Sequence, residues 1–188
     1  MNDIDFHALR ATRAENPGAI AHAFATRRRR SLTDGDGRLM IVAADHPARG
    51  ALGVGGDLGA MSNRENRLSA VVRALARPGV EGVLATPDII DDLVLLGALD
   101  EKIVVGSMNR GGLSGASFEM DDRFGAYDIP AIVRDKLDFA RTFTGINLSD
   151  AGTANTLEAT ARAVTAAAQA QVPIMVEPFR SMAKWAMF

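Results

Sequence analysis

The stretch LMIVAADHPARG, residues 39–50, joins an unbroken apolar segment to an acid, an imidazole and a proline. Its six apolar residues, 39–44, can bury both faces of a strand, as in a parallel sheet that helices cover. Asp45 and His46 then fall at the end of that strand, where a charged side chain must be paired, solvated or used. The stretch therefore predicts a parallel α/β sheet that delivers polar groups to one end of its strands.

The same pattern recurs along the chain, where short apolar runs that end in polar residues alternate with segments of helical periodicity. The predicted strands lie at residues 39–45, 80–86, 102–108, 143–149 and 172–178. The predicted helices lie at residues 3–16, 16–30, 62–79, 86–100, 128–143 and 153–171. Such alternation is typical of βαβ units with parallel strands and right-handed crossovers. We therefore predict a single α/β domain over residues 1–188, with two N-terminal helices in residues 1–30.

Local signals refine the helices. Ser62 and Glu65 have the spacing of a capping box, and Pro87 and Pro130 stand near the starts of their helices. The arginine run 27–30 is expected to be a solvated, basic end of the second helix. Apolar spacing predicts the following inward-facing residues in the last two helices: Ile132, Val133, Leu137, Leu157, Ala161 and Val164.

Two architectures fit five parallel strands. An open, doubly wound sheet would be complete at this length, whereas a (β/α)8 TIM barrel needs about 250 residues. No helical pattern follows the fifth predicted strand, which would leave one face of a finished open sheet uncovered. We therefore expect a TIM barrel truncated to about five βα units.

Composition excludes several classes of function. The net charge is −2, which argues against nucleic acid as a partner, and there are no cysteines for disulfides or thiolate metal sites. The N-terminus does not resemble a signal peptide, and no apolar run approaches membrane-spanning length. These features predict a cytoplasmic protein that binds neither nucleic acid nor membrane.

The carboxyl ends of parallel strands usually form the active site. Asp45, His46 and Glu177 lie there and are the predicted catalytic residues, because carboxylates at a barrel mouth can act as acid or base. For His46, a structural role as an ordinary hydrogen-bonded histidine agrees with the sequence equally well. The following residues at these ends are expected to be helix caps: Thr86, Asp88 and Asp150.

The predicted substrate-binding residues are Asn109, Arg110 and Asn147. Arg110 opens a long glycine-rich loop, residues 109–128, which can close over a substrate while the arginine reaches a phosphate or carboxylate. A surface loop without a role is the alternative. The glycine spacing of this loop does not match the known nucleotide-binding motifs, which argues against a nucleotide site. No cofactor and no metal ion are predicted.

Four segments together resemble a known group of enzymes: residues 40–50, 79–90, 102–112 and 172–179. Within these segments, the dipeptides Asp45-His46 and Glu177-Pro178 are the parts distinctive enough to count as motifs. The sequence resembles the class I aldolase superfamily of (β/α)8 barrels, which includes deoxyribose-phosphate aldolases and DhnA-like fructose-bisphosphate aldolases. Within it, the sequence is most similar to actinobacterial barrel proteins found with inositol and sugar catabolism genes.

The resemblance implies a carbon–carbon lyase that forms a Schiff base between a lysine and a keto-sugar or sugar phosphate. Asp45 matches the family's acidic residue at the first strand, but the lysine of the sixth strand lies beyond this chain. Of 21 basic residues only Lys102, Lys136 and Lys184 are lysines, and none is well placed. The 188-residue chain alone is therefore expected to be inactive and, with an open sheet edge, to associate as a homo-oligomer.

The sequence is also compatible with two other functional hypotheses. One is a metal-dependent aldolase or hydratase that uses Asp45, His46 and Glu177 as ligands. The other is a non-catalytic fragment of a barrel that needs a partner to cover its open edge.

Overall fold

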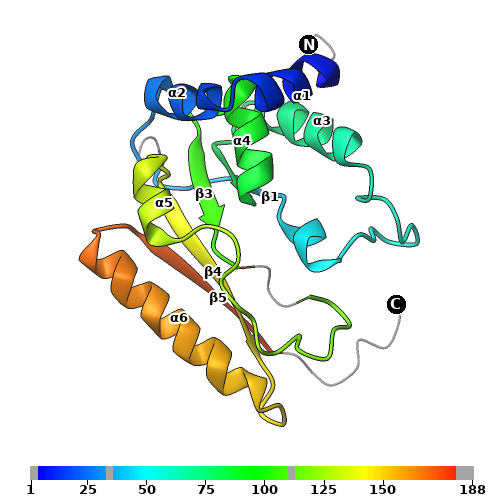
Figure 1. Cartoon of the computed structure of the whole chain (residues 1–188), viewed down its shortest axis with the longest axis vertical. Coiled ribbons are helices and arrows are strands. Elements are labelled where there is room, and N and C mark those ends of the chain that lie inside the picture. Colours follow the sequence, from blue (N-terminus) through cyan, green and yellow to red (C-terminus); the bar gives the residue numbers. More distant parts are fainter. Residues whose placement is uncertain (1–3, 33–35, 110–112, 181–188) are drawn as a thin grey trace.

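The computed structural model describes residues 4–32, 36–109 and 113–180. Helices and strands alternate after an N-terminal helical pair (Figure 1). In chain order the elements are α1 (Phe6–Glu15), α2 (Gly18–Thr26), β1 (Ile41–Ala43), the 3-10 helix η1 (His46–Arg49), α3 (Arg64–Leu75), β2 (Gly82–Ala85), α4 (Pro87–Leu95), β3 (Ile103–Ser107), α5 (Ile129–Arg134), β4 (Phe139–Ile146), α6 (Gly152–Gln169) and β5 (Ile174–Arg180).

The five strands form one parallel sheet in the order β1-β2-β3-β4-β5. This sequential order confirms the predicted set of parallel strands and rules out the doubly wound alternative, in which the strand order reverses partway. The two faces differ. Val83, Val104 and Ala140 pack in the large core beneath the helices, whereas Leu84, Ile103 and Val105 pack on the opposite face.

The sheet is curled into a half-barrel around the face that carries Leu84, Ile103 and Val105. No helix among the described residues covers this face, and we call it the helix-free face. β1 and β4 are separated by two strands, so in a flat sheet they would lie about 14 Å apart. Arg141 of β4 nevertheless donates to the carboxylate of Asp45, just after β1, at 2.8 Å. One side chain can span this distance only because the sheet bends toward it.

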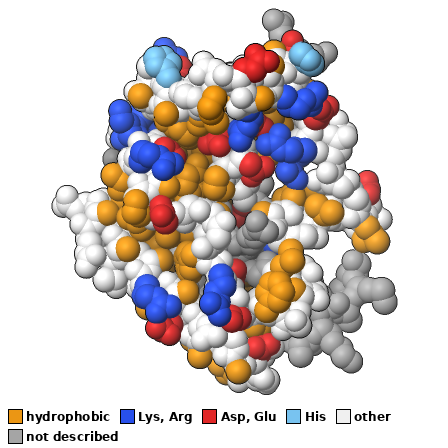
Figure 2. Space-filling view, viewed as in Figure 1, with side chains coloured by type: hydrophobic (Ala, Val, Ile, Leu, Met, Phe, Trp, Pro, Cys, Tyr) orange, Lys and Arg blue, Asp and Glu red, His pale blue; other side chains and the backbone are white. Residues whose placement is uncertain are grey.

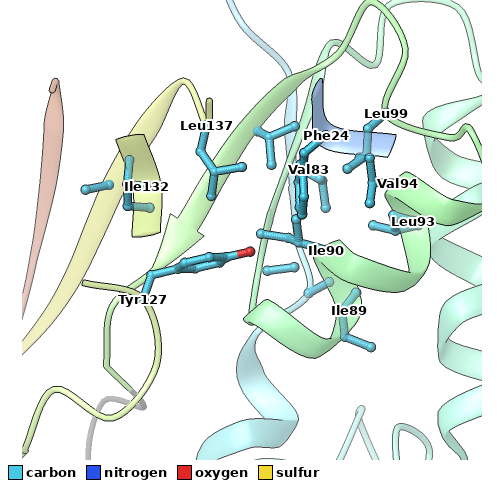
Figure 3. Close-up of a cluster of buried hydrophobic side chains, with 14 of the residues drawn as sticks. Phe24, Val83, Ile89, Ile90, Leu93, Val94, Leu99, Tyr127, Ile132 and Leu137 are labelled. Carbon is cyan, nitrogen blue, oxygen red and sulfur yellow. The ribbon is translucent and has the colours of Figure 1, made fainter. Parts of the chain in front are cut away.

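The largest core cluster lies between the sheet and the outer helices. Figure 3 shows Phe24 of α2, Val83 of β2 and Ile90 of α4 packed together, with the ring of Tyr127 reaching in from the segment before α5. Burial raises the pKa of the Tyr127 hydroxyl. Gly106 of β3 allows this close packing, because a Cβ there would lie 2.4 Å from Ile132 and 2.8 Å from the Tyr127 ring.

The prediction of a solvated arginine run after α2 holds for the two arginines that follow Arg27, which are exposed, but is wrong for Arg27. Arg27 is buried and donates to the carbonyls of Lys102 and Lys136, each at 2.9 Å. Burial lowers the pKa of Arg27, and the neighbouring Asp138 opposes this shift. Asp138 also accepts from Arg29 at 2.7 Å and from the backbone N–H of Val104 at 2.8 Å. This arginine latch ties the N-terminal helices to the amino ends of β3 and β4.

Two helix starts and ends differ from the predictions for local reasons. The predicted Ser62–Glu65 capping box is wrong: Asn63 caps α3 by accepting from Asn66 N at 2.9 Å. The helix predicted at residues 128–143 was too long, because α5 ends at Arg134 and Lys136 adopts φ 53°. β4 therefore begins at Phe139, four residues earlier than predicted, and Val133 is exposed.

α6 also presents a different face from the predicted one. Leu157, Ala161 and Val164 are exposed, and a row of threonines and alanines is buried instead. The threonine hydroxyls find acceptors inside the protein, since Thr156 donates to Met120 O at 2.6 Å and Thr153 to Asn147 O at 2.7 Å. Small side chains and internal hydrogen bonds thus outweigh the apolar spacing.

Asp138→Ala should lower the free energy of unfolding by about 3–5 kcal/mol, because it leaves the buried guanidinium of Arg27 without its carboxylate. Glu158→Ala, in the exposed pair with Arg162 on α6, should cost less than about 0.5 kcal/mol. Urea denaturation followed by circular dichroism measures both. Similar losses in the two variants would contradict the importance of the latch.

Candidate functional site

Three charged side chains meet on the helix-free face, toward the carboxyl ends of the strands. Arg141 of β4 donates through Nη1 to Asp45 at 2.8 Å and through Nε to Glu177 of β5 at 3.0 Å, and its Nη2 also contacts Glu177. The side chains of Arg141 and Asp45 are 6% and 11% exposed, whereas that of Glu177 is 52% exposed. We call Asp45, Arg141 and Glu177 the charge cluster.

The alternation of β4 explains why Arg141 faces this side. Phe139 packs on the helix-free face, Ala140 packs in the core under the helices, and Thr144 reaches Thr160 of α6 at 3.1 Å. Side chains two residues apart share a face, so Arg141 and Phe143 point the same way as Phe139. On the amino-terminal side of the charge cluster, the helix-free face is apolar. The charged side chains of the cluster are therefore confined to the carboxyl end of the half-barrel.

Neighbouring groups hold the cluster in place. Ser107 of β3 donates to Asp45 at 3.3 Å and to the carbonyl of Asn109 at 2.9 Å. The guanidinium carbon of Arg141 lies 5.2 Å from the centre of the Phe143 ring, a cation–π distance. A half-exposed carboxylate beside a covered ion pair can exchange a proton with a bound ligand while the ion pair fixes its position.

The structure brings together two of the predicted catalytic residues, Asp45 and Glu177, through an arginine that the sequence did not single out. His46 adjoins them, with its Nδ1 3.9 Å from Asp45 Oδ1, and its side chain is 46% exposed. Over the described ranges, no group of three or more His, Cys, Asp or Glu side chains could hold a metal ion.

The predicted substrate-binding residues lie elsewhere. Asn109 is fully buried, and its amide bonds Asp122 at 2.6 Å and both backbone groups of Phe143. Asn147 is in the turn before α6, where its side chain accepts from Ser149 N at 3.1 Å. Arg110 lies outside the described residues. Of the three predicted caps, Asp150 accepts from Gly152 N at the start of α6. Thr86 is the N-cap residue of α4 but makes no capping hydrogen bond, because its hydroxyl donates to the side chain of Asp88 in the first turn.

A cavity of about 620 Å³ lies on the outer surface between residues 123–130 and α6, away from the charge cluster. Apolar side chains gather over this region in Figure 2. None of the predicted site residues in the described parts of the chain lines this cavity, so we do not connect it with the chemistry of the site.

Asn109→Ala should lower the free energy of unfolding by about 2–4 kcal/mol, because it removes three buried hydrogen bonds, two of them to the backbone N–H and carbonyl of Phe143. Asn147→Ala, at a half-buried turn, should cost less than about 1 kcal/mol. Thermal and urea unfolding of both variants test this difference. Equal losses of unfolding free energy in the two variants would show that the hydrogen bonds of Asn109 do not contribute more to stability than those of Asn147.

Comparison with known proteins corrects the expected family. The crystal structure of Cgl0159 from Corynebacterium glutamicum is similar to this chain with a TM-score of 0.91 and 63% sequence identity. The match covers 94% of this chain but 60% of that one, so the chain spans about three fifths of its relative. No curated protein matches the sequence.

The family model that matches residues 37–186 is described as Cgl0159-like. The assignment to the class I aldolase superfamily, with its actinobacterial inositol-linked branch, is therefore wrong. Neither the matching family model nor the 63% identical structure is described as an aldolase. The Asp-His and Glu-Pro dipeptides behind it are too short to identify a family. The chain belongs to the Cgl0159-like family.

Proposed function

We propose that the charge cluster is the proton-transfer part of an active site that breaks a carbon–carbon bond of a keto-sugar or sugar phosphate. The observation that carries this proposal is the convergence of Asp45 and Glu177, from the two outer strands of the sheet, on one guanidinium at 2.8 and 3.0 Å. Two carboxylates fixed at one open site suit a reaction that needs both a base and an acid.

The chemistry divides between the two carboxylates. In a retro-aldol step a base removes the proton of a hydroxyl group, the adjacent carbon–carbon bond breaks, and its electrons pass to a carbonyl or iminium group. Glu177 is exposed enough to take up and return that proton, whereas Asp45 is covered and held by Arg141 and Ser107. We assign Glu177 as the acid–base and Asp45 as the residue that fixes the arginine.

The electron acceptor is proposed to come from polypeptide beyond this chain. Lys102 lies at the amino end of β3, where its ammonium donates to Val80 O at 2.6 Å. Lys136 follows α5 at that same end, and Lys184 lies outside the described residues. A lysine amine that forms a Schiff base must be desolvated near the substrate, and the two described lysines lie at the wrong end of the strands.

The sequential strand order and the curl of the sheet also support a larger fold. We propose that the five strands are the first part of a (β/α)8 barrel. The unmatched two fifths of the Corynebacterium protein are long enough to supply further βα units. In this arrangement the charge cluster would lie at the mouth of the closed barrel.

A chimera tests the proposed reaction. It joins this chain to the part of the Corynebacterium protein that it does not match, in the order found there. We expect the chimera to cleave at least one of a panel of ketose phosphates, with aldehyde release followed by a coupled dehydrogenase assay. Glu177→Gln and Asp45→Asn should each lower kcat/KM by about 100-fold or more.

Glu158→Gln, in the exposed pair on α6, is the matched control and should leave the rate unchanged. Full activity in Glu177→Gln would remove that residue from the mechanism. A well-folded chimera that cleaves no member of the panel would contradict the proposed reaction.

The open sheet edges predict association of the isolated chain. β1 and β5 end the sheet, and Val176, on the helix side of β5, is 45% exposed because no described helix follows that strand. Unpaired edges and bare apolar residues favour contact between copies. Sedimentation velocity should show oligomers, which Val176→Lys reduces and Val164→Lys on exposed α6 does not. A monomeric wild-type chain at 50–100 µM, about a hundredfold above a micromolar Kd, would contradict this.

A further inference from the structure

A second arginine lies beside the charge cluster without a carboxylate of its own. Arg49 ends η1, four residues after Asp45, and its guanidinium carbon is 5.1 Å from the centre of the Phe143 ring. Within residues 4–32, 36–109 and 113–180, no ion pair or side-chain hydrogen bond involves this guanidinium. Arg141 differs, because it already bonds two carboxylates.

The position of Arg49 is fixed by its surroundings. Phe143 is buried, each of the two guanidinium carbons lies about 5 Å from the centre of its ring, and the centre of the Phe179 ring of β5 lies 5.3 Å away. The backbone carbonyl of Arg49 accepts from Ser114 N at 2.8 Å, and Gly50 ends η1 with φ 84°. A guanidinium stacked on a buried ring with an anchored backbone loses little freedom when it binds a ligand.

The unused donors of Arg49 indicate which ligand suits this position. Asp45 and Glu177 both bond Arg141, so the guanidinium of Arg49 keeps its own donors available, although the four side chains together carry no net charge. A guanidinium has five N–H donors and no acceptor, and its planar fork matches the paired oxygens of a phosphate or a carboxylate. Phe143 pairs with Glu177 in the sheet register, which places Arg49 over the same part of the helix-free face.

We propose that Arg49 binds a terminal oxyanion, a phosphate or a carboxylate, of the substrate whose reacting carbon atoms lie at the charge cluster. This inference rests on the proposed function for the identity of the reacting groups. Arg49 is thereby a specificity residue: it selects anionic substrates and sets the distance from the oxyanion to Glu177.

Binding experiments on the 188-residue chain test the site without any need for turnover. Dihydroxyacetone phosphate, pyruvate and uncharged dihydroxyacetone are titrated separately at low ionic strength and followed by calorimetry. We expect at least one of the two anions to bind at least tenfold more tightly than dihydroxyacetone. The preferred anion identifies phosphate or carboxylate as the natural group.

Arg49→Met should weaken binding of the preferred anion at least tenfold, and Arg49→Lys should weaken it less, because lysine keeps the charge and loses the fork. Arg73→Met, at an exposed position of α3, is the control and should change nothing. Circular dichroism confirms that each variant is folded. Wild-type binding by Arg49→Met, or equal affinity of the wild type for anions and dihydroxyacetone, would overturn the inference.

The outcome is separable from that of the proposed reaction. Arg49-dependent anion binding together with an inactive chimera would retain the anion site and reject the lyase. A chimera that cleaves unphosphorylated and phosphorylated ketoses equally well, with and without Arg49, would retain the lyase and reject the anion site.

Discussion

The ion pair between Arg141 and Asp45 is the constraint on which the site depends. It joins two strands that a flat sheet would hold about 14 Å apart, and this single contact therefore reflects the curl of the four strands from β1 to β4. Burying a guanidinium and a carboxylate is costly unless their hydrogen bonds are satisfied. Glu177 and Ser107 supply those bonds, so the charges and the curvature stabilise each other.

The two ends of the half-barrel use arginine in different ways. At the amino ends of the strands, Arg27 is buried among backbone carbonyls and paired with Asp138, which makes it a structural group. At the carboxyl ends, Arg141 shares its carboxylates with a half-exposed glutamate, and Arg49 lies over an aromatic ring with donors to spare. Between the two ends the helix-free face is apolar. The polarity of the strands thus separates the stabilising charges from those available for chemistry.

Much of this arrangement was predictable from short sequence patterns. The buried run before Asp45 and the repeated strand–helix alternation predicted the parallel sheet, and the placement of acids after those runs predicted that Asp45 and Glu177 would share one end. Arg141 was missed because apolar spacing extended the preceding helix over it. The alternation of Phe139, Arg141 and Phe143 was the signal that could have placed it in a strand.

Other differences arise from contacts that a linear pattern does not contain. Asn109 looked like a ligand-binding residue at a strand end, but backbone groups of Phe143, 34 residues away, occupy its amide. The inward face of α6 depends in part on an acceptor for the Thr156 hydroxyl that lies 36 residues away, the carbonyl of Met120. Arg27, the first arginine after α2, is buried because carbonyls far along the chain accept its hydrogen bonds. Each of these requires the tertiary fold to be known.

The arginine latch also bears on how the chain reaches its folded state. Arg27 and the carboxylate that neutralises it are 111 residues apart in sequence. Contacts at such separation are slow to form, since a long loop must close before they contribute. During synthesis the N-terminal helices therefore emerge well before Asp138, and the guanidinium of Arg27 stays in water until that residue has been made. The N-terminal helices can pack on α4 earlier, but the latch itself can close only after Asp138 has been synthesised.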